Sequence, residues 1–286
     1  MSIMQFVIIS LLQGVTEWLP ISSSGHVLLA SSYFGFGTRD ELLINAMAHV
    51  GTLFAVLLYF WKDVGRAIGG GFELVGAPFR KAGLSANARL AVLILVSMPI
   101  ALAIALLHEI VLTDEMKSAL RSVWTVAGST FVFGLLLWWA DVKGENRKDV
   151  SHMSIRDAVL IGASQAIAAV IPGTSRSGIT MTAARWMGFE RTEAARFSML
   201  IGAPILAAGG VYAVLEFLTA DAGEGVATLA DGMVVAGLSF LSGIVSIWAL
   251  MAILKRMSFL PFVIYRILLA VLLILFSPLV LGIIPG

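Results

Sequence analysis

The stretch QGVTEWLPISSSGH, residues 13–26, places a glutamine, a glutamate, three serines and a histidine inside an otherwise apolar segment. Pro20 lies in the middle of it, and proline ends or kinks a helix because it lacks a backbone donor. A helix that only crosses lipid gains nothing from such side chains, since unpaired polar groups are costly in hydrocarbon. The stretch therefore predicts a broken segment that faces protein or a polar cavity.

The composition of the whole chain is that of a membrane protein. Of its 286 residues 59% are hydrophobic and 13% are charged, and the mean hydropathy is +0.95. Soluble domains are about 45–50% apolar and about 25% charged. The net charge of +1 argues against a nucleic-acid partner, and the absence of cysteine excludes disulfides and thiolate chemistry.

Six apolar runs are each close to the roughly 20 residues that span a bilayer. They are residues 42–61, 90–107, 123–140, 197–215, 232–254 and 262–284. The sequence thus predicts an all-α polytopic membrane protein that forms a single integral membrane domain over residues 1–286.

A shift of 152 residues reveals an internal repeat. IMQFVIISLLQGVTEWLPISSSG begins at residue 3 and IRDAVLIGASQAIAAVIPGTSRS begins at residue 155, so that Gln13 matches Gln165 and Pro20 matches Pro172. Three apolar runs follow each copy. We therefore divide the chain into a first repeat, residues 1–141, and a second repeat, residues 151–286.

The basic residues orient these repeats. Four loops, 62–89, 141–156, 185–196 and 255–266, hold 15 of the 19 lysines and arginines, and such loops are usually cytoplasmic. Six spans satisfy this pattern only if segments 3–34 and 155–187 enter and leave on one side. The sequence thus predicts two inverted-topology repeats, each a re-entrant helix pair followed by three transmembrane helices.

The second polar cluster is PGTSRSGIT, residues 172–180. An arginine deep in an apolar segment is usually a functional group that faces a cavity, although Arg176 could instead reach an interface or pair with a carboxylate. Its neighbours are hydroxyls and a glycine at a helix start, which together favour anion binding. We expect Arg176 to bind phosphate with its planar fork, and the other expected substrate-binding residues here are Gly173, Thr174, Ser175 and Ser177.

Glu17 is the acidic counterpart of this arginine. It follows Gln13 by four residues, so that both side chains lie on one face of a helix. The pair could hold a divalent cation, or Glu17 could act as a general base. A carboxylate that is satisfied by the turn at Ser22 to Ser24, or neutralised by Arg176, is the structural alternative.

His26 closes the first cluster beside Ser22 and Ser23. It is a candidate nucleophile, nucleophile partner or proton donor, or a hydrogen-bonded structural residue. We interpret His49, on an apolar run, as a helix-packing residue. The chain has no P-loop, H-E-x-x-H or G-x-S-x-G motif, which argues against nucleotide hydrolysis and against the common intramembrane proteases and serine hydrolases.

Together, Gln13-x-x-x-Glu17 with LPISSSGH, and PGTSRSGIT, closely resemble the motifs of the bacterial undecaprenyl-diphosphatase family, also called the bacitracin-resistance protein family. HVGTLFAVLLYFWKD and SFLPFVIYRI resemble further segments of that family. The resemblance implies a multi-pass enzyme of the bacterial inner membrane, with its active site facing the periplasm. Such an enzyme removes a phosphate from undecaprenyl diphosphate, which regenerates the lipid carrier for cell-wall synthesis and confers bacitracin resistance.

The resemblance also implies site residues and a cofactor. The catalytic set maps onto Glu17, Ser23, His26, Ser175 and Arg176, with Gln13 and Ser22 beside it in substrate-binding roles. A divalent cation, Mg²⁺ or Ca²⁺, is implied at Glu17 and Gln13, where some family members have a second glutamate and where an amide is the weaker ligand.

Several alternatives stay open at this point. Ser23, His26 or an activated water could attack the phosphate that Arg176 and the 173–178 backbone hold. An inverted-repeat transporter or flippase for a phosphorylated polyprenyl lipid fits the same features, as does a non-catalytic lipid-phosphate receptor. The expected partners are a polyprenyl diphosphate lipid and membrane lipids, and the sequence leaves a homodimer open.

Overall fold

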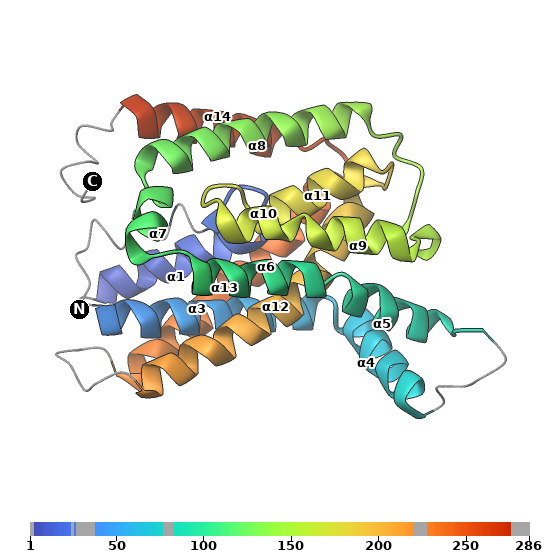
Figure 1. The fold of residues 1–286 in the computed structure, drawn as a ribbon, viewed down its shortest axis with the longest axis horizontal. Coiled ribbons are helices and arrows are strands. Elements are labelled where there is room, and N and C mark those ends of the chain that lie inside the picture. The colour runs from blue at the N-terminus through green and yellow to red at the C-terminus, as the bar shows by residue number, and fades with distance from the viewer. Residues whose placement is uncertain (1–2, 24–25, 27–37, 77–82, 220–227, 276–286) are drawn as a thin grey trace.

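The computed structural model describes residues 3–23, 26, 38–76, 83–219 and 228–275. These residues form helices, with one isolated backbone bridge between Lys148 and Phe189. The helices, shown in Figure 1, are α1 (Ile3–Trp18), α3 (Thr38–Tyr59), α4 (Trp61–Gly76), α5 (Ala86–Val96), α6 (Pro99–Val111), α7 (Asp114–Leu120), α8 (Val123–Lys143), η1 (Val150–His152), α9 (Ile155–Ala163), α10 (Gln165–Val170), α11 (Arg176–Trp186), α12 (Arg191–Thr219), α13 (Leu229–Leu254) and α14 (Leu260–Leu275).

Several helices begin where a short polar side chain caps the first turn. Ser122 accepts a hydrogen bond from the backbone of α8, and Thr228 with Asp231 forms a reciprocal capping box at the start of α13. Such caps satisfy backbone donors that have no partner inside the helix. They fix where the two long apolar helices begin.

The described residues contain four helical segments that are long and apolar enough to cross a membrane: Ala86–Val111, Val123–Lys143, Arg191–Tyr212 and Leu229–Leu254. A fifth candidate is a pair, Leu43–Tyr59 and Trp61–Gly76, bent by 88°. The run predicted at 262–284 is represented by the shorter helix Leu260–Leu275, and residues 276–284 lie outside the described part. A multi-pass helical membrane protein is therefore confirmed, with four or five of the six predicted spans.

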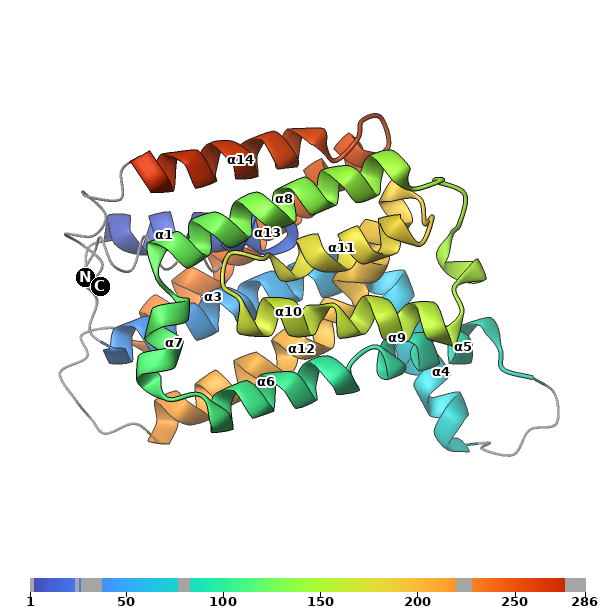
Figure 2. The same cartoon turned by 45° about the horizontal axis from the view of Figure 1, so that its top comes forward.

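Helices from the two halves of the sequence pack against each other. α1 and α3 of the first half contact α13, and α3 also contacts α12, while α8 contacts α11 and α14 of the second half (Figure 2). Small residues permit the closest approaches: a Cβ on Gly14 would lie 1.8 Å from Ser242 Oγ, and one on Gly51 would lie 2.2 Å from the Ala236 carbonyl oxygen. Small residues allow helix backbones to pack closely in membrane proteins.

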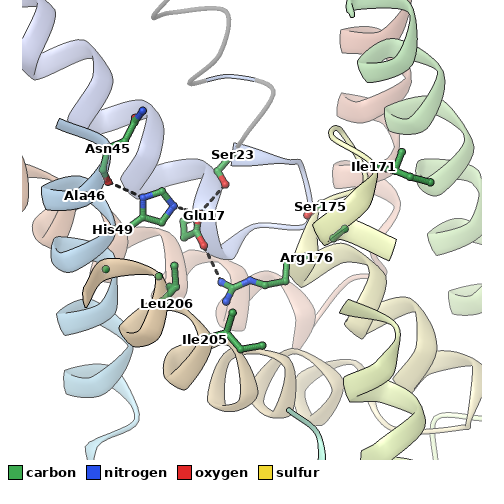
Figure 3. Close-up of a pocket in the computed structure, with 13 residues that line it drawn as sticks. Glu17, Ser23, Asn45, Ala46, His49, Ile171, Ser175, Arg176, Ile205 and Leu206 are labelled. Atoms are coloured by element: carbon green, nitrogen blue, oxygen red, sulfur yellow. Dashed lines mark hydrogen bonds and ion pairs between the residues drawn. The ribbon is translucent and has the colours of Figure 1, made fainter. Parts of the chain in front are cut away.

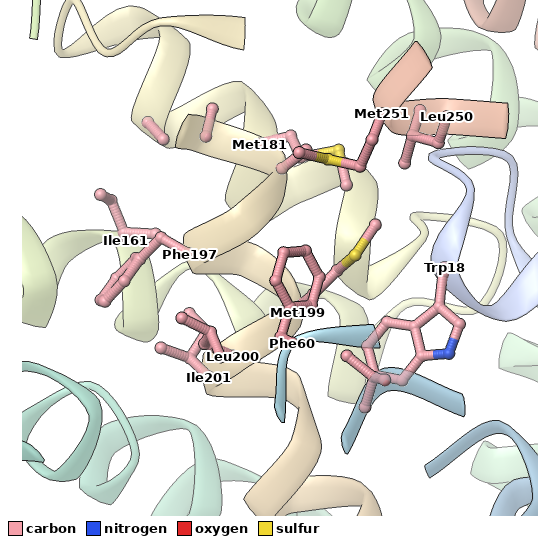
Figure 4. Close-up of a cluster of buried hydrophobic side chains, with 14 of the residues drawn as sticks. Trp18, Phe60, Ile161, Met181, Phe197, Met199, Leu200, Ile201, Leu250 and Met251 are labelled. Carbon is pink, nitrogen blue, oxygen red and sulfur yellow. The ribbon is translucent and has the colours of Figure 1, made fainter. Parts of the chain in front are cut away.

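A large apolar cluster lies between these helices and includes Trp18, Phe197 and Met199 (Figure 4). The Trp18 indole donates a hydrogen bond to the Thr52 carbonyl oxygen at 3.1 Å. Because a buried indole N–H needs an acceptor, this bond fixes the end of α1 against α3. The cluster thus anchors the helix that carries Glu17.

Two breaks in the helical structure lie side by side. We call residues 19–23, after α1, the first break, and residues 171–175, between α10 and α11, the second break. Ser22 and Ser175 have positive φ angles, 75° and 69°, a conformation that non-glycine residues adopt rarely and mostly at functional or strained sites. The Ser177 hydroxyl joins the breaks by donating to the Leu19 carbonyl oxygen at 2.9 Å.

Candidate functional site

A cavity of about 410 Å³ lies beside the two breaks (Figure 3). Its polar lining residues come from α1, the first break, α3 and the second break with the start of α11. Its apolar wall comes from α3, α10 and α12. The residues that line it are Glu17, Ser23, Asn45, Ala46, His49, Ala168, Ile171, Ser175, Arg176, Ile205, Leu206, Gly209 and Gly210.

Glu17 is the only carboxylate among these lining residues, and it is buried, with 7% of its surface exposed. Its Oε1 accepts from Arg176 Nη2 at 2.8 Å. Its Oε2 accepts from the Ser23 hydroxyl at 2.7 Å and from Gln13 Nε2 at 2.9 Å. The carboxylate therefore joins the first break to the second, as the sequence alternative of a Glu17–Arg176 pair foresaw.

Arg176 begins α11 and points across the cavity to α1. Besides its ion pair with Glu17, it donates from Nη1 to the Gly202 carbonyl oxygen of α12 at 2.7 Å. Its guanidinium carbon lies 5.4 Å from the centre of the Trp18 ring, within cation–π range. The side chain remains 19% exposed, so that a ligand in the cavity can reach it.

The serines that line the cavity have different partners. The Ser23 hydroxyl donates to Glu17, which is the contact expected between a nucleophile and its base. Ser175 caps α11 by accepting from the Gly178 backbone N–H at 3.1 Å. Ser175 thus holds the helix start whose backbone donors favour an anion, while the Ser23 hydroxyl is hydrogen-bonded to the carboxylate.

His49 is the cavity residue that the sequence interpretation missed. Its Nδ1 lies 2.7 Å from the Asn45 carbonyl oxygen, which can only accept, so Nδ1 carries a proton. Its Nε2 then lies on the cavity side, 3.9 Å from Glu17 Oε2 (Figure 3). A histidine within an apolar run gave no local signal, because its partner on α1 is distant in sequence.

His26 lies outside this cavity. Its Nδ1 donates to the Ser22 carbonyl oxygen at 2.7 Å, and its Nε2 lies 2.6 Å from the Tyr265 hydroxyl. The His26 and Tyr265 rings stack with their centres 5.8 Å apart. The structure therefore places His26 between the first break and α14, and does not bring it to Glu17 as the sequence led us to expect.

Five predicted binding residues do not line the cavity: Gln13, which donates to Glu17, and Ser22, Gly173, Thr174 and Ser177, which support the breaks. The hydroxyls of Thr174 and Ser177 donate to the carbonyl oxygens of Ile171 and Leu19. Gly173 has a φ of +86°, and a Cβ there would lie 2.2 Å from Ser129 Oγ. Of the residues 173–178 that we expected to hold the phosphate, Ser175 and Arg176 line the cavity.

Two arginines that we assigned to cytoplasmic loops are fully buried. Arg185 donates from Nε to Asp141 at 2.8 Å, which pairs it with a carboxylate. Arg266 lies in α14 and contacts both breaks. The 15 basic residues that we counted in cytoplasmic loops therefore include two side chains that are buried inside the protein.

The site does not provide a ready divalent-cation site. Among the described residues, no group of three or more His, Asp or Glu side chains is gathered where it could hold a metal ion. Both oxygens of Glu17 already accept hydrogen bonds, and Gln13 presents its amide nitrogen to Glu17. An arginine and two neutral donors around one carboxylate do not match the several oxygen ligands that Mg²⁺ or Ca²⁺ prefers.

Comparison with known proteins gives a consistent result. A sequence model of the bacitracin resistance protein BacA family matches residues 6–272. A protein of Hyphomonas neptunium (strain ATCC 15444), named undecaprenyl-diphosphatase, is 59% identical over 282 residues, covering 99% of both chains. Relatives of the same name from Maricaulis maris (strain MCS10) and Jannaschia sp. (strain CCS1) are 42% and 41% identical, covering 96% and 97% of this chain and 99% of their own. This chain belongs to the bacitracin resistance protein BacA family.

Proposed function

We propose that this chain hydrolyses undecaprenyl diphosphate to undecaprenyl phosphate and inorganic phosphate. This reaction recycles the lipid carrier of cell-wall synthesis and confers resistance to bacitracin. The relatives' name supports the substrate, and one observation carries the site: Ser23, Glu17 and Arg176 form a continuous chain of contacts at one cavity.

Arg176 binds the diphosphate in this proposal. Its Nη2 pairs with Glu17, and a phosphate that enters the cavity competes with Glu17 for the Arg176 guanidinium. Arginine suits phosphate because its planar fork donates two hydrogen bonds. The start of α11, capped by Ser175, adds the favourable end of a helix dipole to the same side of the cavity.

Ser23 is the proposed nucleophile, with Glu17 as its base. The Ser23 oxygen bonds to the terminal phosphorus, its proton passes to Glu17, and the bond from that phosphorus to the bridging oxygen breaks. Undecaprenyl phosphate leaves with the bridging oxygen. Glu17 then releases the serine proton to solvent. Water attacks the phosphoserine, and Glu17 takes a proton from that water and passes it to the Ser23 oxygen as the bond between phosphorus and that oxygen breaks, so that inorganic phosphate is released. Phosphoryl transfer depends mainly on such positioning and charge neutralisation.

The apolar wall of the cavity suits the first part of the isoprenoid chain. Ile171, Ile205 and Leu206 provide aliphatic surface, and Gly209 has nothing within 4 Å of an added Cβ. Burial of apolar surface gives affinity of about 25 cal/mol per Å² without directional contacts. The headgroup and the lipid tail thus contact different walls of one cavity.

The proposed mechanism assigns no residue of the site as a ligand of a divalent cation. The carboxylate that would hold it is already occupied, so we expect any Mg²⁺ or Ca²⁺ that the reaction needs to arrive with the diphosphate. Isothermal titration of the lipid-free protein should show no binding of either ion below about millimolar concentration. Micromolar binding that Glu17→Gln abolishes would restore the cation site predicted from the sequence.

The membrane arrangement is also part of the proposal. We propose one domain over residues 1–286, built of two interlocked, inverted repeats, in the bacterial inner membrane with the cavity open to the periplasm. The two breaks, each with a positive-φ serine, support the repeat.

Release of phosphate from undecaprenyl diphosphate by purified protein in detergent tests the function. Detergent removes vectorial transport and leaves hydrolysis. We expect release by the wild-type protein and by Ser97→Ala, a buried serine that does not line the cavity. We expect no release by Ser23→Ala, and a phosphoserine that is trapped by acid only when Ser23 is present.

The competing functions predict a different result. A transporter, a flippase or a lipid-phosphate receptor would bind the lipid in detergent but release no phosphate with Mg²⁺, with Ca²⁺ or with a chelator. If Ser23→Ala releases phosphate at the wild-type rate, the chain is still a phosphatase, but water attacks the phosphate in place of Ser23.

A further inference from the structure

Arg266 has an unusual set of partners for a fully buried arginine. Its Nε donates to the Thr130 carbonyl oxygen of α8 at 3.0 Å, and its Nη1 donates to that of Pro20 at 3.3 Å. Its Nη2 donates to the carbonyl oxygens of Gly173 and Thr174 at 3.1 and 3.0 Å. One guanidinium therefore joins α14, α8 and both breaks.

These four partners are backbone oxygens, and no ion pair is found for Arg266 among the described residues. Arg185, the other fully buried arginine in the described part of the chain, is paired with Asp141. Burial of a charge without a counter-ion opposes folding unless hydrogen bonds satisfy it. An apolar side chain could fill the same position without the desolvation cost of a buried charge. Stability alone therefore does not explain Arg266.

The bonded carbonyls belong to the residues that set the geometry of the cavity. Pro20 lies three residues after Glu17 and three before Ser23, while Gly173 and Thr174 lead directly to Ser175 and Arg176. A shift of either carbonyl moves one half of the site relative to the other. Tyr265, the preceding residue of α14, adds a contact to the first break through His26.

We propose that Arg266 is a positioning residue of the phosphatase reaction: it holds the two breaks at the separation that brings Ser23 and Glu17 to the phosphate bound by Arg176. This inference rests on the proposed function. Arginine is required because its five donors lie in a rigid plane, which reaches carbonyls of three chain segments at once. Lysine presents three donors at a single point and cannot span them.

Arg266→Lys should lower kcat about 100-fold, the loss that a misplacement of about 1 Å can cause. It should also raise the dissociation constant of methylenediphosphonate, measured by isothermal titration, because Arg176 and Ser175 lose their position. The matched control is Arg185→Lys, which alters a buried arginine that contacts neither break. That variant should keep kcat even if its melting temperature falls.

A double-mutant cycle separates positioning from a general structural effect. If Arg266 acts by positioning Arg176 through the second break, Arg176→Lys already removes most of the phosphate binding that depends on Arg266. The combined Arg176→Lys/Arg266→Lys loss should then be close to that of Arg176→Lys alone. A combined loss equal to the product of the two single losses would overturn the proposal.

A glycine pair on α8 tests the same idea without altering Arg266. A Cβ on Gly134 would lie 3.2 Å from Arg266 Cβ, whereas a Cβ on Gly128 would meet nothing within 4 Å. Both changes favour the helix, since alanine is a better helix former than glycine by about 1 kcal/mol. Gly134→Ala should lower kcat several-fold, and Gly128→Ala should leave it unchanged.

Two results distinguish failure of the positioning role from failure of the proposed function. If the wild-type protein binds methylenediphosphonate but releases no phosphate, the phosphatase function is refuted. The dissociation constants of the variants would then still test whether Arg266 positions the binding residues. If Arg266→Lys and Gly134→Ala keep both kcat and the dissociation constant within twofold of wild type, the positioning role is wrong.

Discussion

The two breaks use the same backbone device and supply opposite charge. Each follows an apolar helix, contains a proline and has a serine at positive φ. The end of α1 and the first break bring Glu17 and Ser23, and the second break and the start of α11 bring Ser175 and Arg176. One side of the cavity therefore carries a carboxylate and a hydroxyl, and the other carries a hydroxyl and a guanidinium. Two breaks of similar backbone conformation thus build an asymmetric site where they face each other.

Loss of the acidic half should have the largest effect. Glu17→Gln removes the acceptor of the Ser23 proton and should lower kcat by about 10³-fold, within the range of general-base catalysis. Phosphate release under saturating lipid measures it. A rate within tenfold of wild type would show that Glu17 is only a partner of Arg176.

Loss of the arginine fork in the second break should have the next largest effect. Arg176→Lys keeps the charge but loses two-point binding, and we expect kcat/KM to fall about 100-fold. The matched control is Arg191→Lys, which alters an arginine paired with Asp141 away from the cavity. Near-normal turnover and a normal KM for Arg176→Lys would contradict the assignment.

The ion pair between the halves can be tested through stability. Either Glu17→Gln or Arg176→Gln alone leaves a buried charge without its partner, which costs about 3–5 kcal/mol. Glu17→Gln/Arg176→Gln removes both charges, so its melting temperature in detergent should exceed that of each single variant. Additive losses in the double variant would indicate that the two side chains are not coupled.

Tyr265→Phe should have the smallest effect. It removes the hydroxyl 2.6 Å from His26 Nε2 and leaves the stacked ring in place. A hydrogen bond of this kind contributes about 1 kcal/mol, so we expect a fall in kcat of at most about tenfold. A loss as large as that of Glu17→Gln would mean that His26 itself takes part in the chemistry.

Much of this was predictable from residue types and spacing. Composition and apolar run length predicted a multi-pass helical protein, because hydrophobic length is a local property. Polar side chains next to prolines in apolar segments identified both breaks, and Glu17 and Arg176 followed from the cost of a charge in such a segment. The family followed from the same two motifs.

The sequence could not show which polar residues reach the cavity and which support it. Ser22, Gly173, Thr174, Ser177 and His26 share the motifs with Ser23 and Arg176, yet they contact the breaks themselves or the neighbouring helices α8 and α14. His49 and Arg266 lie in segments that resemble the family, but those segments indicated no role for either residue. Their roles depend on partners 32 or more residues away in the chain, and no local pattern encodes such pairings.

The sequence by itself determined that this chain is a helical membrane protein with two broken polar segments, since hydrophobicity and helix breaking act over a few residues. Only the tertiary structure decided that His49 lies beside Glu17 and His26 does not, and that Arg266 donates to carbonyl oxygens of both breaks. The physical reason is that a buried polar group must find partners wherever packing brings them.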